Sequence, residues 1–200
     1  MLLNGVRWDE ARSLAMTCGR NREPDERQDP ANTTMGERKM PVSLRESLNE
    51  ITNPANLDAS VKEIFEVMLG ASCGREDGEL KPEADWVTAV VGFGGVLSGA
   101  CVFRSGGQAA RRVAERMTGV AFAEVDDTVK DGIGELCNML AGSWKGKVPE
   151  LAAHCGLSVP AVITGREYEL HVQAPEFRLR HVYGFDGVRF EVTILCDGIA

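Results

Sequence analysis

Positive charge is scarce in this chain of 200 residues. It carries 22 Lys and Arg against 30 Asp and Glu, which gives a net charge of -8 and a pI near 5.0. Proteins that bind nucleic acids rely on Lys and Arg side chains that contact phosphates, and anionic membranes attract the same residues. We therefore expect neither a nucleic acid nor a membrane among its partners.

Closely paired cysteines are absent as well. The six cysteines are scattered along the chain, and none belongs to a Cys-x-x-Cys pair. A disulfide scaffold would be shorter and denser in cysteine, so the sequence favours reduced thiols and a cytoplasmic location. The first residues contain no continuous apolar segment and soon become acidic, which argues against a signal peptide.

One segment without charge invites comparison with a membrane span. Trp86 to Phe103 contains no charged residue over 18 positions, which is near the lower limit for crossing a bilayer. However, four glycines interrupt it, and its five valines favour strands. The segment therefore predicts a hairpin of two buried strands joined around Gly94-Gly95, because glycine adopts the positive φ that tight turns require.

The organisation of the chain follows from its composition. Residues 1–45 are rich in Arg, Asp, Glu, Asn and Pro, a composition that predicts a disordered N-terminal tail. Residues 46–200 carry the periodic patterns of a folded domain. Its first predicted helix has Asp58 as N-cap and Gly70 as its C-terminal stop. A second helix follows Gly106-Gly107 and ends at Gly119.

The C-terminal part alternates apolar and polar residues with a period of two. This alternation predicts strands near residues 167–172, 177–183 and 188–194. Strands with one polar face indicate an antiparallel sheet that carries helices on its other face. We therefore predict an α+β fold with an antiparallel-rich β-sheet and helices packed on it.

A third helix is predicted from Asp126-Asp127 towards Gly142 or Lys145, and it carries the most informative pattern of the chain. At about 100° per residue, four apolar side chains share one narrow stripe. Asp131, Glu135 and Asn138 lie together on the opposite side. Small residues flank this polar face, which would suit insertion into the polar cleft of a partner. The stripe consists of Val129, Ile133, Leu136 and Leu140.

This pattern resembles the signature of the CheC/CheX chemotaxis phosphatases. That signature has an acid, then Glu-x-x-Asn, then a distant proline; here these are Asp131, Glu135, Asn138 and Pro160, with 21 residues between the last two. The resemblance covers about residues 53–196 and includes a single such site, as in CheX. A second Glu-x-x-Asn, from Glu50 to Asn53, runs into Pro54, which disfavours helix at Asn53, so we interpret that copy as chance.

The resemblance implies a phosphatase that hydrolyses the aspartyl phosphate of a CheY-type response regulator in two-component signalling. Glu135 and Asn138 would be catalytic: Asn138 would orient the attacking water, and Glu135 would pair with the regulator's Lys. Asp131, Gly134 and Gly142 would contribute to partner binding. The resemblance further implies a homodimer formed by joining sheets, and no cofactor of its own, with Mg²⁺ on the partner regulator.

Three other interpretations of the sequence were considered beside the phosphatase prediction. The domain could be a non-catalytic module that binds a response regulator or a flagellar-switch-type complex. Glu150, His154 and Cys155 could suggest a metal site, but no second ligand cluster has suitable spacing, so we expect no metal. Cys137 points towards the apolar side of the third helix, which predicts packing and not catalysis.

Overall fold

The computed structural model describes residues 48–166, 168 and 175–199. The predicted disordered tail, the predicted domain boundary at residue 46 and most of the strand predicted over residues 167–172 lie outside these residues.

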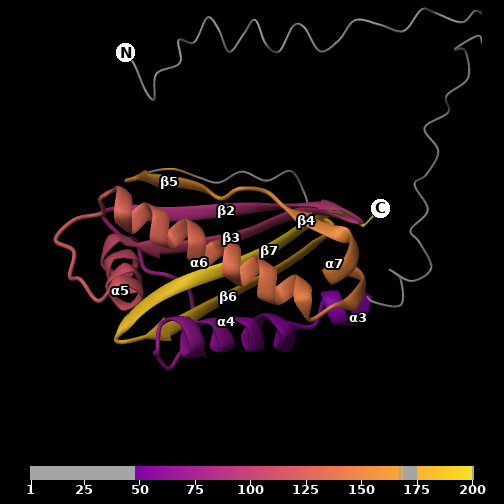
Figure 1. Cartoon of the computed structure of the whole chain (residues 1–200), viewed down its shortest axis with the longest axis horizontal. Coiled ribbons are helices and arrows are strands. Elements are labelled where there is room, and N and C mark those ends of the chain that lie inside the picture. The colour runs from indigo at the N-terminus through magenta and orange to yellow at the C-terminus, as the bar shows by residue number, and fades with distance from the viewer. Residues whose placement is uncertain (1–47, 167, 169–174, 200) are drawn as a thin grey trace, which may run out of the picture. The chain divides into compact units, whose positions relative to one another are not determined.

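Seven antiparallel strands form a single sheet in the described part of the chain (Figure 1). The strand order is β1-β6-β7-β3-β2-β4, and β5 pairs with β2 on the same side as β4. The predicted α+β fold with an antiparallel sheet is confirmed. The strands are β1 (Gly74–Glu76), β2 (Trp86–Gly95), β3 (Leu97–Gly106), β4 (Cys155–Leu157), β5 (Ala161–Gly165), β6 (Phe177–Phe185) and β7 (Val188–Ile199).

Three longer helices cover one face of this sheet, with α6 crossing its middle (Figure 1). Gly119 ends α5 with a φ of 73°, as predicted for a C-terminal stop. The helices are α3 (Leu48–Ile51), α4 (Pro54–Met68), α5 (Gly107–Thr118), α6 (Asp127–Gly146) and the short α7 (Pro149–His154).

The prediction that Asp58 is an N-cap is wrong. Helix α4 begins five residues earlier, with Asn53 as its N-cap and Pro54 as its first residue. The Asn53 side chain accepts a hydrogen bond from the Ala55 amide at 3.0 Å, and proline is favoured at this first position because its missing N–H is not needed there.

Asp58 instead joins α4 to the sheet. Its Oδ1 accepts a hydrogen bond from the Tyr183 hydroxyl at 2.8 Å and lies 3.1 Å from Nδ1 of His181. Arg75 approaches its other oxygen at 3.5 Å. Burial and the Asp58 carboxylate both raise the pKa of Tyr183 far above its usual value. Asp58 therefore serves as an anchor between α4, β1 and β6.

The uncharged segment forms the predicted β2–β3 hairpin. Gly95 has a φ of 113°, and a Cβ at this position would collide with the His154 carbonyl oxygen. Only glycine fits this turn without rearrangement. Among the described residues, no helix has the length and apolar character to cross a membrane.

An aromatic cluster fills the space between the sheet and the helices. Phe190 on β7 is fully buried and stacks on Phe65 of α4, with ring centroids 4.8 Å apart, and on Phe103 of β3, at 5.1 Å. Tyr183 and Phe185 complete its surroundings at 5.6 and 5.9 Å. Phe190 thus connects three strands to the first long helix.

The opposite face of the sheet is less exposed than its polar residues suggest. Glu191 and Thr193 on β7 are both buried. The Arg180 side chain donates to the Glu191 carboxylate at 2.7 Å, which compensates the cost of burying that charge. The alternating pattern therefore identifies the two faces of the sheet but not their exposure.

Buried thiols predict a loss of stability at alkaline pH. Burial raises the pKa of Cys196 from 9.0 to about 12, with smaller contributions from Cys155 and Glu176. Because the folded-state pKa is raised, this contribution is intact below pH 9 and is lost as the pH rises towards 12. Each pH unit in that window costs at most about 1.4 kcal/mol per thiol.

We expect urea unfolding to show a steeper loss of stability between pH 9 and 10.5 for the native chain than for Cys196→Ala. Cys73, whose pKa burial and Glu76 also raise to about 12, remains in both proteins and serves as the common background. Equal pH dependence in the two proteins would contradict the assignment.

Candidate active site on helix α6

Helix α6 begins with two stabilising contacts. Asp126 is its N-cap, and its carboxylate accepts a hydrogen bond from the Val129 amide at 2.9 Å. In the first turn, Lys130 pairs with Asp127 at 2.9 Å, which lowers the pKa of Asp127 and raises that of Lys130. The helix therefore starts at the predicted residues.

The inner face of α6 is fixed against the sheet. The four residues of the predicted apolar stripe are all fully buried. Cys137 is fully buried too, and its thiol donates weakly to the backbone carbonyls of Ala89 and Cys101, at 3.6 and 3.5 Å. The prediction that Cys137 packs inward is confirmed, and burial of the stripe determines which side of α6 faces outward.

The outer face carries the predicted polar residues. Asp131 and Glu135 are exposed, and Asn138 is half-buried. Within the described ranges, no hydrogen bond or ion pair engages the side chains of Glu135 or Asn138. Both side chains are thus available to a partner and lie one helical turn apart on one side.

Gly134 and Pro160 fit together where α6 meets the edge of the sheet. A Cβ on Gly134 would lie 3.4 Å from Pro160 Cγ and 3.3 Å from Val162 Cγ2. Gly134 is buried, so its visible role is close packing. Its predicted contact with a partner stays a prediction. One turn beyond Asn138, Gly142 is half-buried, and a Cβ there would reach only Leu157, at 4.0 Å.

The connection between the edge strands β4 and β5 has the register of a β-bulge. Ser158 pairs with Gly92, through its amide to the Gly92 carbonyl at 2.9 Å, and Ala161 pairs with Val90. Two residues, 159 and 160, therefore lie opposite Val91 alone. Such bulges redirect side chains and are frequent next to active sites, and this one brings Pro160 onto Gly134.

Ser158 is a structural residue of this site that was not predicted. Its hydroxyl accepts a hydrogen bond from the Gly92 amide at 2.9 Å and donates to the Val159 carbonyl at 2.9 Å. The available signal was Pro160 itself, since proline inside a strand indicates an edge or a bulge.

The first half of the outer face of α6 carries a line of acidic residues. Asp127, Asp131 and Glu135 follow one another at intervals of four residues, so they form a line on one side of the helix. Lys130 forms an ion pair with Asp127, at the start of this line. The end of the line nearest Asn138 is therefore anionic and suits a cationic side chain of a partner.

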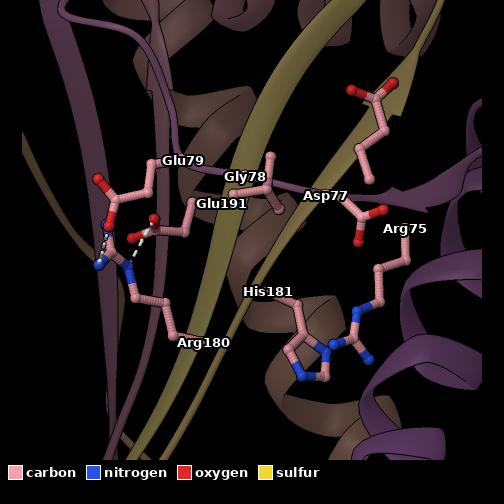
Figure 2. Close-up of a pocket in the computed structure, with 9 residues that line it drawn as sticks. Arg75, Asp77, Gly78, Glu79, Arg180, His181 and Glu191 are labelled. Carbon is pink, nitrogen blue, oxygen red and sulfur yellow. Dashed lines mark hydrogen bonds and ion pairs between the residues drawn. The ribbon is translucent and has the colours of Figure 1, made fainter.

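A separate hollow of about 230 Å³ lies beside β6, away from these residues (Figure 2). Arg180 lies close to Glu79 and Glu191 there, at 3.9 and 2.7 Å, and Figure 2 shows both contacts. Arg75, on the other side, pairs with Asp58. These pairs leave the arginines little free charge, so the hollow is a weaker candidate for a site. No group of three or more metal-binding side chains occurs in the part of the chain that the structure describes.

The fold is that of CheX-like and CheC-like proteins. The family model for the chemotaxis phosphatase CheX matches residues 87–180, a range that contains both the Glu135–Asn138 pair and Pro160. The comparisons confirm the resemblance to the CheC/CheX family, with the family model matching just under half of the chain.

Individual relatives agree with this assignment. The chain is 28% identical over 85 residues to the CheY-P phosphatase CheX of Thermotoga maritima. The matched segment covers 42% of this chain and 55% of that protein. It thus spans about half the length of that curated relative. Two crystal structures share the fold. Chemotaxis protein CheX from Vibrio vulnificus has a TM-score of 0.62 and 18% identity, over 74% of this chain and 96% of that one. The CheX-CheY-BeF3-Mg²⁺ complex from Borrelia burgdorferi has a TM-score of 0.55 and 21% identity, over 72% of this chain and 96% of that one.

Proposed function

We propose that this protein is a CheX-like phosphatase that hydrolyses the aspartyl phosphate of a CheY-type response regulator. The observation that carries the proposal is the unengaged pair of Glu135 and Asn138 on the outer face of a helix whose inner face is completely buried. A carboxylate and a carboxamide in this position are accessible to a second protein without any rearrangement of the domain.

The reaction requires little chemistry from this chain. In the proposed complex, the regulator's own Mg²⁺ and Lys stabilise the charge on its phosphoryl group. Hydrolysis then needs a water molecule held in line with the bond between phosphorus and the aspartyl oxygen. That bond breaks as the water oxygen attacks, and inorganic phosphate and the free carboxylate result. Asn138 orients the water, because a carboxamide offers a donor and an acceptor and does not titrate.

The remaining residues hold the complex in register. Glu135 pairs with the regulator's Lys through a charge-assisted hydrogen bond. Asp131 and the open surface at Gly142 belong to the docking face, while Gly134 and Pro160 keep the edge strand against the helix. The Thermotoga relative is a CheY-P phosphatase, and the Borrelia structure is a complex of CheX with CheY. Both support a CheY-type substrate for this chain.

The proposal includes a cytoplasmic homodimer formed by joining two sheets. Strand β7 cannot provide the joining edge, because it pairs with β3 and β6 on its two sides. Strand β6 remains a candidate, since β1 pairs only with its residues Val182 to Gly184. Sedimentation equilibrium of the purified protein tests the dimer.

The direct test follows the loss of phosphate from purified, phosphorylated response regulators with and without this protein. We expect faster loss for a cognate CheY-type regulator. Equal decay rates for every regulator, together with binding to one of them, would leave the non-catalytic binding module in place of the enzyme.

Replacing Glu135 by Lys should weaken binding to the regulator at least about tenfold, because like charges would then face each other. The affinity for the activated regulator is measured by titration calorimetry. Glu50→Lys is the matched control, since Glu50 is exposed and belongs to the second Glu-x-x-Asn of the chain. An unchanged affinity for Glu135→Lys would show that Glu135 has another role.

A further inference from the structure

An apolar side chain is displayed next to the proposed catalytic residues. Val159 is 87% exposed, the largest value among the exposed large hydrophobic residues of the described chain. A single exposed apolar residue is common on protein surfaces and by itself indicates nothing. What distinguishes Val159 is the way its backbone is held and the place where it lies.

The backbone on both sides of Val159 is constrained. On one side, the Ser158 hydroxyl bridges the Gly92 amide of β2 and the Val159 carbonyl, each at 2.9 Å. On the other side, Pro160 lies against Gly134 of α6. The bulge is thus fixed to the sheet and to the helix, so a contact through Val159 costs little ordering entropy.

The geometry of α6 places this bulge beside Asn138. Gly134, Asn138 and Gly142 are four residues apart and form one line along the helix. The chain from β4 to β5 runs beside this line, so that Pro160 lies next to Gly134 and Leu157 lies next to Gly142. Ser158 and Val159, which lie between Leu157 and Pro160, are therefore level with Asn138. Both are exposed, and Val159 is the apolar one.

We propose that the Ser158–Pro160 bulge is a second docking element, in which Val159 is the apolar contact that the regulator buries next to Asn138. This inference rests on the proposed function. Interfaces combine an apolar centre with a polar rim, and a few side chains buried near the centre contribute most of the affinity. Here the anionic line of α6 supplies the polar contacts. The bulge, which lies on the other side of Asn138, supplies the apolar contact.

The test compares Val159→Asp with Val67→Asp. Val67 on α4 is 74% exposed and matches Val159 in residue type and exposure. For a CheY-type regulator activated with beryllofluoride, we expect Val159→Asp to raise Kd about tenfold or more, whereas Val67→Asp has no effect. With the phosphorylated regulator, KM should rise in parallel while kcat at saturation stays within about twofold, because uniform binding is lost. Val159→Ile should keep the native affinity.

The outcomes separate this inference from the proposed function. If the native chain accelerates hydrolysis but Val159→Asp leaves Kd and KM unchanged, the docking role of Val159 is wrong and the phosphatase proposal stands. If the native chain binds regulators without accelerating hydrolysis, the phosphatase proposal fails, and the Kd of Val159→Asp still decides the docking role. If it binds no regulator, both are wrong.

Discussion

Replacing Asn138 by Ala should lower kcat for hydrolysis of the phosphorylated regulator by about 100-fold or more, the usual cost of removing one hydrogen-bonding group that acts in a transition state. The carboxamide is the group that we expect to hold the attacking water in line. Because Glu135, the anionic line on α6 and the bulge remain, binding of the activated regulator should change little. The expected result is therefore a loss in kcat at nearly constant Kd.

The measurement combines single-turnover decay of the phosphorylated regulator with a binding titration. Asn53→Ala is the matched control, since Asn53 occupies the same place in the second Glu-x-x-Asn but serves as the N-cap of α4. We expect that variant to lose about 1 kcal/mol of stability and to keep its kcat. A fully active Asn138→Ala protein would remove the chemical basis of the phosphatase proposal.

Replacing Phe190 by Ala should lower the free energy of unfolding by about 3–5 kcal/mol. Phe190 is fully buried, and its ring packs against Phe65, Phe103, Tyr183 and Phe185. Truncation would leave a cavity between the sheet and α4 that these rigid rings cannot close. Such a loss is a large part of the stability of a typical domain, which is about 5–15 kcal/mol.

Urea denaturation with matched slopes measures this loss. Phe190→Leu is the control, because it keeps most of the apolar volume and should lose clearly less. A loss below about 1 kcal/mol for Phe190→Ala would contradict its central place in the core.

The parts of the fold that follow from local patterns were predictable. Helix α6 has an N-cap at Asp126 and a buried stripe with the helical period, so its start and its two faces agree with the sequence analysis. The β2–β3 hairpin was signalled by its glycines. These features depend on residues close together in the chain, which is why periodicity and turn chemistry find them.

The errors concern contacts between distant segments. Asp58 has a good N-cap side chain, but its partners are His181 and Tyr183, more than 100 residues away. The strand pattern places Glu191 on the polar face, yet Glu191 is buried and accepts a hydrogen bond from Arg180 of the neighbouring strand. No local pattern contains such pairings, and the bulge at Ser158 likewise depends on its register with β2.

The openness of the Glu135–Asn138 face has a consequence for selectivity in the cell. On the proposed mechanism, the metal ion, the lysine and the phosphate all arrive with the regulator, and this chain contributes the remaining water-positioning group. Each protein then holds part of a catalytic apparatus, and fast hydrolysis requires both parts together. Small phosphate esters would be ignored, and the signal would be terminated only where the two surfaces recognise each other.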